Sequence, residues 1–288
     1  MSKKEKIAKY VAIPFAVLAV STAAILIKLS KSHPVAISFY RMGFSALIFL
    51  VPFWMRREKI KKLDSKDLYL SILAGFILAF HFAFWIYSLE LTTVASSVVL
   101  VSSHPLLVLF ISDKFFGENI NKKAYFAVVF ALIGVFLIFI SDLRVENWSV
   151  WGDLFALIGM VLLGFYLSIG KVVREEVPTV IYVFLAYGFA TVVLAILSLF
   201  IGTSFKVYSL GEYGVFLALA IVPTLFGHTV YNWSLRYVQA DLVSISLLGE
   251  PILSSFLALI FLFEIPPLLT IFGGVITIIG IYWSLVLR

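Results

Sequence analysis

Residues 124–140 read AYFAVVFALIGVFLIFI and carry no charged side chain. The stretch is continuously apolar, whereas a strand of a membrane barrel alternates apolar and polar side chains over about ten residues. A helix needs roughly 20 mostly apolar residues to cross a hydrocarbon core of about 30 Å. With its flanking residues this stretch is long enough, so the sequence predicts a transmembrane helix over residues 122–141.

The rest of the chain follows the same pattern. Apolar residues make up 62% of the 288 residues and charged residues 13%, against roughly 45–50% and 25% in soluble domains. So few polar groups cannot cover the surface of a soluble protein. We therefore predict an all-α membrane protein with ten transmembrane helices, at residues 10–29, 34–55, 67–90, 93–115, 122–141, 151–172, 178–201, 212–236, 240–262 and 267–287.

Basic residues are distributed unevenly between the two sides of the predicted bundle. Four lysines lie within residues 3–9 and six basic residues within 56–66, whereas the loops of the opposite side hold Lys28, Lys31, Arg144 and Lys206. Cytoplasmic loops are enriched in Lys and Arg, so we expect a multi-pass protein of the cell membrane with both termini cytoplasmic. The net charge of +6 then reports topology: the partner is the lipid bilayer, and a nucleic acid is not expected.

Rare residues recur along the chain after 146 residues. Pro105, Glu118 and Gly134 align in this way with Pro251, Glu264 and Gly280. We therefore expect two repeats, residues 1–145 and 146–288, of five helices each. Because five is odd, the second repeat must enter from the opposite face. Inverted repeats around a central cavity near the bilayer midplane are a recurring transporter design.

Two polar residues stand before the equivalent prolines, Glu250 in the predicted ninth helix and His104 in the fourth. Glu250 is about ten residues into its helix and therefore near the bilayer centre, where an isolated charge costs at least about 2.5–3.5 kcal/mol. Both should face the interior, as contacts for a substrate or a proton, or else as hydrogen-bonding groups that pack helices. The two polar-Pro steps are candidate flexible points beside the cavity.

Five further residues complete the predicted cavity. Arg41 lies roughly 10 Å below the outer end of its helix, where it clamps a substrate carboxylate, pairs with an acid of the third or ninth predicted helix, or extends to the surface. His81 and His228 occupy nearly equivalent positions in the two repeats and are expected to line the cavity as hydrogen-bonding groups. Asn232 lies one turn beyond His228, and Trp85 adds an aromatic wall suited to an amphipathic solute, although packing in the core is the alternative role for any one aromatic residue.

Signatures of enzymes and cofactors are missing from the sequence. It contains no HExxH, GxSxG, Walker or GxGxxG pattern. The absence of cysteine excludes disulfides and thiol catalysis, and the four histidines lack the spacing of metal ligands. We expect no enzyme, no metal and no cofactor.

The order of the rare residues resembles the drug/metabolite transporter superfamily, specifically its EamA-type family. Members of that family carry in each repeat a proline in the fourth helix, often preceded by Glu, then Gly-Glu at the end of that helix and a Gly-rich fifth helix. The second half here has Glu250-Pro251, Glu264 and Gly273-Gly274, and the first half has Pro105, Gly117-Glu118 and Gly134. Nearly the whole chain takes part in the resemblance.

Other positions extend the resemblance or depart from it. Arg41 and Trp151-Gly152-Asp153 at the start of the sixth helix are family-like, whereas His104 replaces Glu and Phe263 replaces Gly. The resemblance implies a basket of helices around a central cavity, with the fifth and tenth helices peripheral. It also implies transport of small metabolites, frequently the export of amino acids.

These observations predict a secondary transporter, acting as an exporter of small metabolites such as amino acids by alternating access. Glu250, His104 and Arg41 would be the main polar contacts and protons a candidate coupling ion. The alternative is an intramembrane enzyme or receptor acting on a lipid or small ligand. The duplication favours transport, because alternating access uses pseudo-symmetry and catalysis does not need it.

Overall fold

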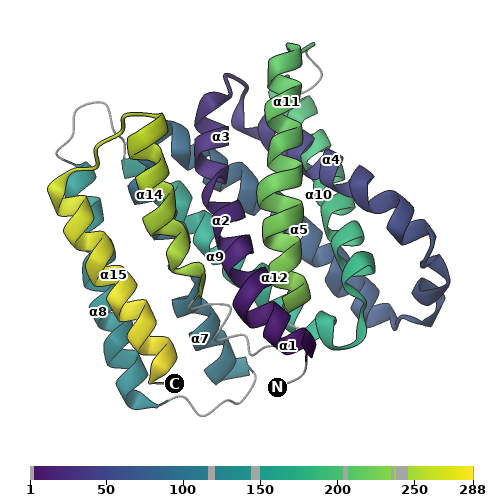
Figure 1. The fold of residues 1–288 in the computed structure, drawn as a ribbon, viewed down its shortest axis with the longest axis horizontal. Helices are drawn as coiled ribbons and strands as arrows, with labels where there is room; N and C mark the ends of the chain where they lie inside the picture. The colour runs from purple at the N-terminus through teal and green to yellow at the C-terminus, as the bar shows by residue number, and fades with distance from the viewer. Residues whose placement is uncertain are drawn as a thin grey trace.

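A computed structural model describes residues 3–115, 121–143, 150–203, 207–234, 237 and 246–287 (Figure 1). Every regular element in these ranges is helical. In chain order they are α1 (Lys3–Ile7), η1 (Ala8–Ala12), α2 (Ile13–Ser21), α3 (Ala23–Leu29), α4 (Pro34–Trp54), η2 (Arg57–Lys62), α5 (Ser65–Leu91), α6 (Val94–Val101), α7 (His104–Phe115), α8 (Lys122–Asp142), α9 (Val150–Glu176), α10 (Thr179–Ile201), α11 (Leu210–Leu219), η3 (Ala220–His228), α12 (Thr229–Ser234), α14 (Gly249–Phe261) and α15 (Leu268–Val286).

The predicted all-α membrane fold is confirmed. Within the described ranges, eight continuous helical stretches are long and apolar enough to cross a membrane, and two shorter apolar helices, Gly249–Phe261 and Leu268–Ser284, follow them. Several spans join short elements: α1 to α3 form one, α6 and α7 another, and α11, η3 and α12 a third. Both termini lie at the same end of the bundle (Figure 1), which we call the terminal end. The opposite end we call the far end.

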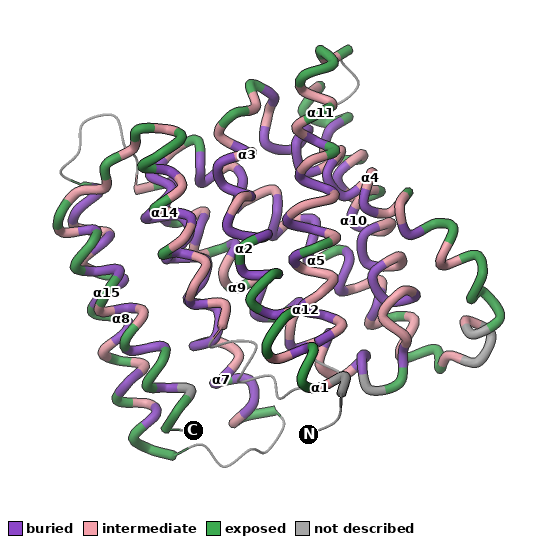
Figure 2. The backbone as a smooth tube through the Cα atoms, in the orientation of Figure 1, coloured by how far each residue is buried: buried purple, intermediate pink, exposed green. Residues whose placement is uncertain are grey.

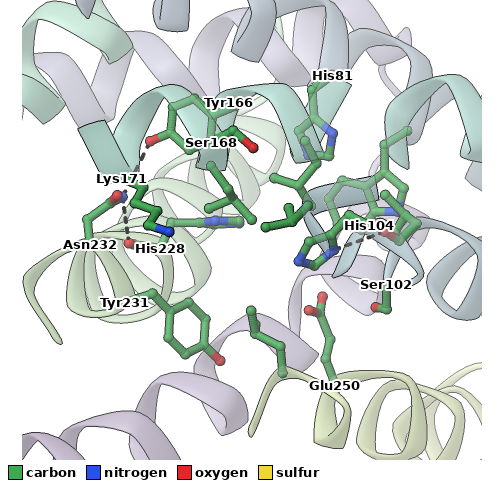
Figure 3. Close-up of a pocket in the computed structure, with 16 residues that line it drawn as sticks. His81, Ser102, His104, Tyr166, Ser168, Lys171, His228, Tyr231, Asn232 and Glu250 are labelled. Carbon is green, nitrogen blue, oxygen red and sulfur yellow. Dashed lines mark hydrogen bonds between the residues drawn. The ribbon is translucent and has the colours of Figure 1, made fainter. Parts of the chain in front are cut away.

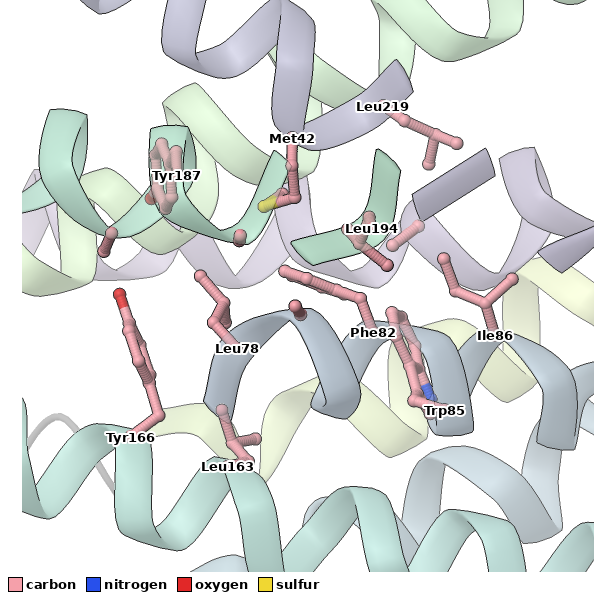
Figure 4. Close-up of a cluster of buried hydrophobic side chains, with 14 of the residues drawn as sticks. Met42, Leu78, Phe82, Trp85, Ile86, Leu163, Tyr166, Tyr187, Leu194 and Leu219 are labelled. Carbon is pink, nitrogen blue, oxygen red and sulfur yellow. The ribbon is translucent and has the colours of Figure 1, made fainter. Parts of the chain in front are cut away.

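The burial pattern is that of a protein surrounded by lipid. Large apolar side chains such as Phe126, Phe136 and Phe200 are exposed on the outside of the bundle, and exposed positions run along the outer helices in Figure 2. The interior is built mainly from α4, α5, α9 and α10, where Met42, Phe82 and Tyr187 pack together (Figure 4). These four helices pack side by side on one side of the molecule.

The last helices of the two repeats pack against each other as an antiparallel pair, α8 and α15 (Figure 1). A Cβ added at Gly134 would lie 2.6 Å from Thr277 N, and a Cβ added at Gly280 would lie 2.6 Å from Ala131 N. Under the 146-residue shift these are the same contact, made once in each direction. Such a reciprocal contact requires a pseudo-two-fold axis perpendicular to both helices, so the repeats are inverted.

Two of the predicted continuous helices are broken where the sequence has a polar residue before proline. The fourth predicted helix divides at Ser102-Ser103 into α6 and α7, and α7 begins at His104. Proline is favoured in the first turn of a helix, because the missing N–H has no partner there, and this explains the start of α7 before Pro105.

The predicted ninth helix, residues 240–262, is described from residue 246 onward, and α14 begins at Gly249. Glu250 therefore lies in the first turn of a helix, not ten residues into one. Residues 240–245 of that prediction, and Glu118, Arg144, Lys206 and Arg236, lie outside the described residues.

Candidate functional site

A cavity lies between α5, α6, α7, α9, α12 and the start of α14 (Figure 3). It is bounded by helices of both repeats, and both polar-Pro steps reach it. Its walls combine aromatic and aliphatic surface with a small number of polar groups, as ligand sites generally do. The lining residues are His81, Trp85, Val101, Ser102, His104, Val108, Leu163, Tyr166, Leu167, Ser168, Lys171, His228, Tyr231, Asn232, Leu247 and Glu250.

The structure brings together six of the seven predicted cavity residues. His81, Trp85, His104, His228, Asn232 and Glu250 all line this one cavity. Arg41, the seventh, is not part of the lining. Within the described ranges, no group of three or more His, Asp or Glu side chains is placed to hold a metal ion.

Two of the lining histidines have a defined tautomer when they are neutral. His81 Nδ1 lies 2.9 Å from Gly159 O, and His104 Nδ1 lies 3.2 Å from Val101 O. A carbonyl oxygen only accepts, so in each ring Nδ1 carries the hydrogen and donates. Nε2 of a neutral ring is then an acceptor. His104 Nε2 is fully buried and has no partner within the described residues, so it is available to a donor on a bound solute.

Glu250 enters the cavity from the first turn of α14. Its carboxylate points toward the side of the cavity that holds His104 (Figure 3). Trp85 Nε1 and Tyr231 Oη, two further polar atoms of the lining residues, are buried without a partner in the described part of the chain. The site thus offers acceptors at Glu250 and His104, and unused donors at Trp85 and Tyr231.

Arg41 is fully buried behind the cavity wall. Its Nε donates to Thr224 Oγ1 at 2.9 Å, and its guanidinium carbon lies 4.2 Å from the centroid of the Phe82 ring and 5.9 Å from that of Trp85. Neither Nη atom has a hydrogen-bond partner among the described residues. Of the two predicted positions for Arg41, the surface is ruled out, and the aromatic pair separates it from the cavity.

The segment that receives Arg41 is irregular. Thr224 belongs to η3, a π-helical stretch interrupted by Pro223, and the Thr224 hydroxyl donates to Leu219 O at 2.9 Å. Its oxygen is thus free to accept from Arg41. π-Helical segments are rare and occur frequently at functional sites, and this one runs directly into His228 of the cavity.

The sixth helix contributes cavity residues that the sequence analysis did not select. Tyr166, Ser168 and Lys171 of α9 line the cavity, and Asn232 Nδ2 donates to Tyr166 Oη at 3.3 Å. The available signal was the spacing of Ser168 and Lys171 by three positions, which places both on one face of a helix.

The cavity extends toward the terminal end and is closed at the far end. Lys171, near the end of α9, and Asn232, near the end of α12, lie on the side of the termini. In the other direction, residues 92–100 are all buried. Ser88 Oγ and Ser97 Oγ lie 2.6 Å apart there and are buried. A solute bound at Glu250 would therefore be separated from the far end by buried residues.

Inverted helical repeats around a one-sided polar cavity define the class of membrane transporters that carry small solutes. A sequence profile of the EamA-like transporter family matches residues 7–140 and again residues 150–286. The chain belongs to this family, within the drug/metabolite transporter superfamily, and is a transporter, not an enzyme. The family and the presence of two repeats, both predicted from the sequence, are confirmed.

Characterised and uncharacterised transporters are among its relatives. An uncharacterized transporter of Archaeoglobus fulgidus is 24% identical over 90% of each chain. The pseudopaline exporter CntI of Pseudomonas aeruginosa is 22% identical over 89% of this chain and 88% of its own. An S-adenosylmethionine uptake transporter of Rickettsia felis is 25% identical over 86% of this chain and 82% of its own. Relatives therefore transport in both directions.

A protein of known crystal structure shares the fold. It superposes with a TM-score of 0.68 at 18% identity, and the match covers 96% of each chain. The similarity extends over both repeats, so the arrangement of helices described above is shared by a distant protein.

Proposed function

We propose that the chain is a secondary transporter that exports a small metabolite of the amino-acid kind by alternating access around the cavity. One observation supports this above the others: the two equivalent polar-Pro steps, one from each repeat, meet at a single cavity whose buried polar atoms lack partners. A buried polar group without a hydrogen bond costs about 1–3 kcal/mol. A solute that supplies those bonds recovers the cost.

The donors and acceptors suggest how a solute with both charges would bind. Glu250 and the His104 Nε2 acceptor suit an ammonium group. Trp85 Nε1 and Tyr231 Oη suit a carboxylate, which Arg41 would meet once the Phe82–Trp85 pair moves aside. The aromatic walls suit an apolar side chain. Asn232, His81 and His228 complete the polar surface.

The remaining parts of the proposal concern topology and coupling. We place the repeat boundary between residues 145 and 146, both termini on the cytoplasmic side of the cell membrane, and therefore the closed far end outside. With the cavity open to the cytoplasm, this conformation is the one that loads substrate for export. Protons are the proposed coupling ion, carried by Glu250.

The test is efflux from liposomes that contain the purified protein and a pooled mixture of amino acids and metabolites. The expected result is selective loss of one solute class, removed by Glu250→Ala and retained by Glu58→Gln, a control in an exposed loop side chain (69% exposed). Glu250→Gln should remove the pH dependence of efflux. Folded protein that releases no solute from the pool would contradict the substrate class, and pH dependence unchanged in Glu250→Gln would contradict proton coupling.

A further inference from the structure

A second buried polar site lies at the closed far end, where four elements meet. Thr92 connects α5 and α6, and Asp142 ends α8; Asp153 lies in the first turn of α9 and Thr270 near the start of α15. The first two belong to one repeat and the last two to the other. All four side chains are at most 2% exposed, so the site joins the repeats and excludes water.

If both carboxylates are ionised, the site has more short contacts between oxygen atoms than hydrogens to donate in them. Thr92 Oγ1 lies 2.6 Å from Asp142 Oδ2 and 3.0 Å from Asp153 Oδ1. A hydroxyl has one hydrogen and donates to one acceptor, whereas an ionised carboxylate is an acceptor only. The second short contact therefore requires a hydrogen from a carboxyl group.

A second observation points the same way. Asp153 Oδ2 is fully buried and has no hydrogen-bond partner among the described residues, and Asp153 and Asp142 both contact the one Thr92 hydroxyl. A buried carboxylate oxygen that has no hydrogen-bond partner costs free energy when the carboxylate is charged. Two neighbouring carboxylates that share one proton remove most of that cost, because a like charge and burial both disfavour the second ionisation.

Among the described residues, the charged groups around the site do not supply a full counter-charge. Lys28 of α3 donates to Thr92 O at 3.4 Å, but it also faces Glu90 of α5 and Glu264, which precedes α15. Glu264 Oε1 accepts from Val94 N at 2.6 Å and so caps α6. Burial raises the pKa of Glu264, and the neighbouring charge of Asp142 acts in the same direction. Lys28 is thus shared between two glutamates, and within the described part of the chain no interaction joins it to Asp142 or Asp153.

We propose that Asp142 and Asp153, bridged by the Thr92 hydroxyl, form a proton-binding site that holds the far end of the transporter closed. In the closed state the pair retains one proton and the two repeats stay joined. When the far end opens, water reaches both carboxylates and the proton leaves. High pH therefore favours opening and low pH favours closure. The gating step rests on the alternating access proposed above, whereas the shared proton does not.

Infrared spectroscopy tests for the proton directly and needs no substrate. The Glu250→Gln variant, which removes the carboxyl of the central cavity, should show at neutral pH the carbonyl band of a protonated carboxyl, shifted in D2O. Asp153→Asn and, separately, Asp142→Asn should remove this band. Asp113→Asn should leave it, because Asp113 accepts from Tyr125 and pairs with Lys114 at 3.2 Å as an ionised carboxylate. Absence of the band in Glu250→Gln itself, or its survival in both variants, would overturn the shared proton.

Thiol labelling tests the gate, and the chain suits it because it has no cysteine. Ser97→Cys places a reporter just inside the closed end, where Ser97 is buried. Opening linked to the release of one proton should raise the labelling rate by up to about tenfold per pH unit above the titration of the pair. In lipid nanodiscs, Asp142→Asn combined with Asp153→Asn should make labelling slow and leave only the pH dependence that ionisation of the thiol itself gives. Thr92→Val should weaken the pH dependence while keeping both carboxyl groups.

The outcomes separate this proposal from the proposed function. Labelling that does not change with pH in the Ser97→Cys parent, or that keeps its slope in the double Asn variant, would overturn the gate. Neither measurement uses a substrate or a direction of transport, so failure of efflux for every solute in the pool would leave these results unaffected.

Discussion

The two repeats meet in two contrasting ways. Along α8 and α15 they pack without space for a methyl group, since a Cβ at Gly134 or Gly280 would overlap the facing backbone. At the central cavity they are held apart, and Trp85, His104 and Tyr231 present polar atoms without partners. One interface is closely packed, and the other encloses the cavity. A transporter needs both, because helices can move around a solute only if another part of the contact stays in place.

The difference arises from the residues at equivalent positions. Gly134 and Gly280 are the same in both repeats, and small residues allow two membrane helices to approach closely. At the polar-Pro steps the repeats diverge: His104 stands in one and Glu250 in the other. Symmetry is therefore retained where the repeats hold together and lost where a solute must be distinguished.

The largest effect is expected from filling the fixed interface. Gly280→Leu forces a side chain against Ala131, 2.6 Å from the position of the added Cβ, and should cost at least about 3 kcal/mol, because close-packed backbone cannot shift to accommodate it. The yield of monodisperse protein and its melting temperature in detergent measure this. The control is Gly188→Leu, where nothing lies within 4 Å. Equal losses in both variants would contradict the contrast between the two regions.

The next effect separates stability from transport at Arg41. Arg41→Met removes a guanidinium with two unpartnered nitrogens and fills the space with an apolar chain. Replacing buried charged groups by apolar side chains of similar volume is often neutral or stabilising, by up to about 4 kcal/mol, so the melting temperature should not fall while transport falls. Arg57→Met, in a half-exposed side chain (50%), should change neither. A variant that loses both stability and transport would show that Arg41 serves the packing of the bundle.

A smaller effect is expected at the cavity wall. The Trp85 ring lies parallel to the His81 ring, with 6.1 Å between the ring centroids. Trp85→Phe keeps an aromatic ring there but removes the Nε1–H, which has no partner among the described residues. Loss of one hydrogen bond to a charged group should raise KM about tenfold, or about 1.4 kcal/mol, and leave the maximal rate unchanged. Initial rates of transport over a range of solute concentrations measure this. Trp54→Phe at an exposed position is the control, and an equal rise in KM there would refute the assignment.

The smallest effect is expected at the turn before α15. Phe263 has a φ of 54° and is exposed, and the left-handed region costs a non-glycine residue about 1–2 kcal/mol. Phe263→Gly should raise the free energy of unfolding by about 1 kcal/mol without altering transport. Leu262→Gly, at a φ of −111°, should lower it. Thermal melts of the two variants give the sign, and a loss of stability in both would mean that the Phe263 ring contributes more than its backbone costs.

Much of the fold could be predicted because two of its signals are written in the residue order itself and need no knowledge of side-chain orientation. Continuous apolar stretches locate the spans, and the recurrence of Pro105, Gly134 and their equivalents locates the repeats. The helix breaks were predicted in part: the prolines indicated flexible points, but not that α7 would begin at His104. Phe263 stands where the family commonly has glycine. Its backbone still adopts the positive φ that glycine favours.

The site was predicted less completely because a sequence shows depth better than orientation. Glu250 and His104 stood out as polar residues in apolar surroundings. Tyr166 did not, because aromatic residues are common in every predicted helix and only the rotation of α9 turns it toward Asn232. For Arg41 the sequence left an interior and a surface position open, because the choice between them, and its contact with the Phe82 ring, depend on side chains from different helices. Asp153 stood out only as part of Trp151-Gly152-Asp153, and nothing in the sequence indicated that it would share the Thr92 hydroxyl with Asp142.

The reciprocal contact of α8 and α15 has a consequence for the origin of the chain. Position 131 meets position 280, and position 134 meets position 277, so the surface is complementary to its own copy, as in an isologous dimer. A single five-helix unit with glycine at this position could pair with another unit inserted in the opposite direction. Fusing two such units into one chain fixes their opposite orientations and frees each half to acquire its own residue before proline.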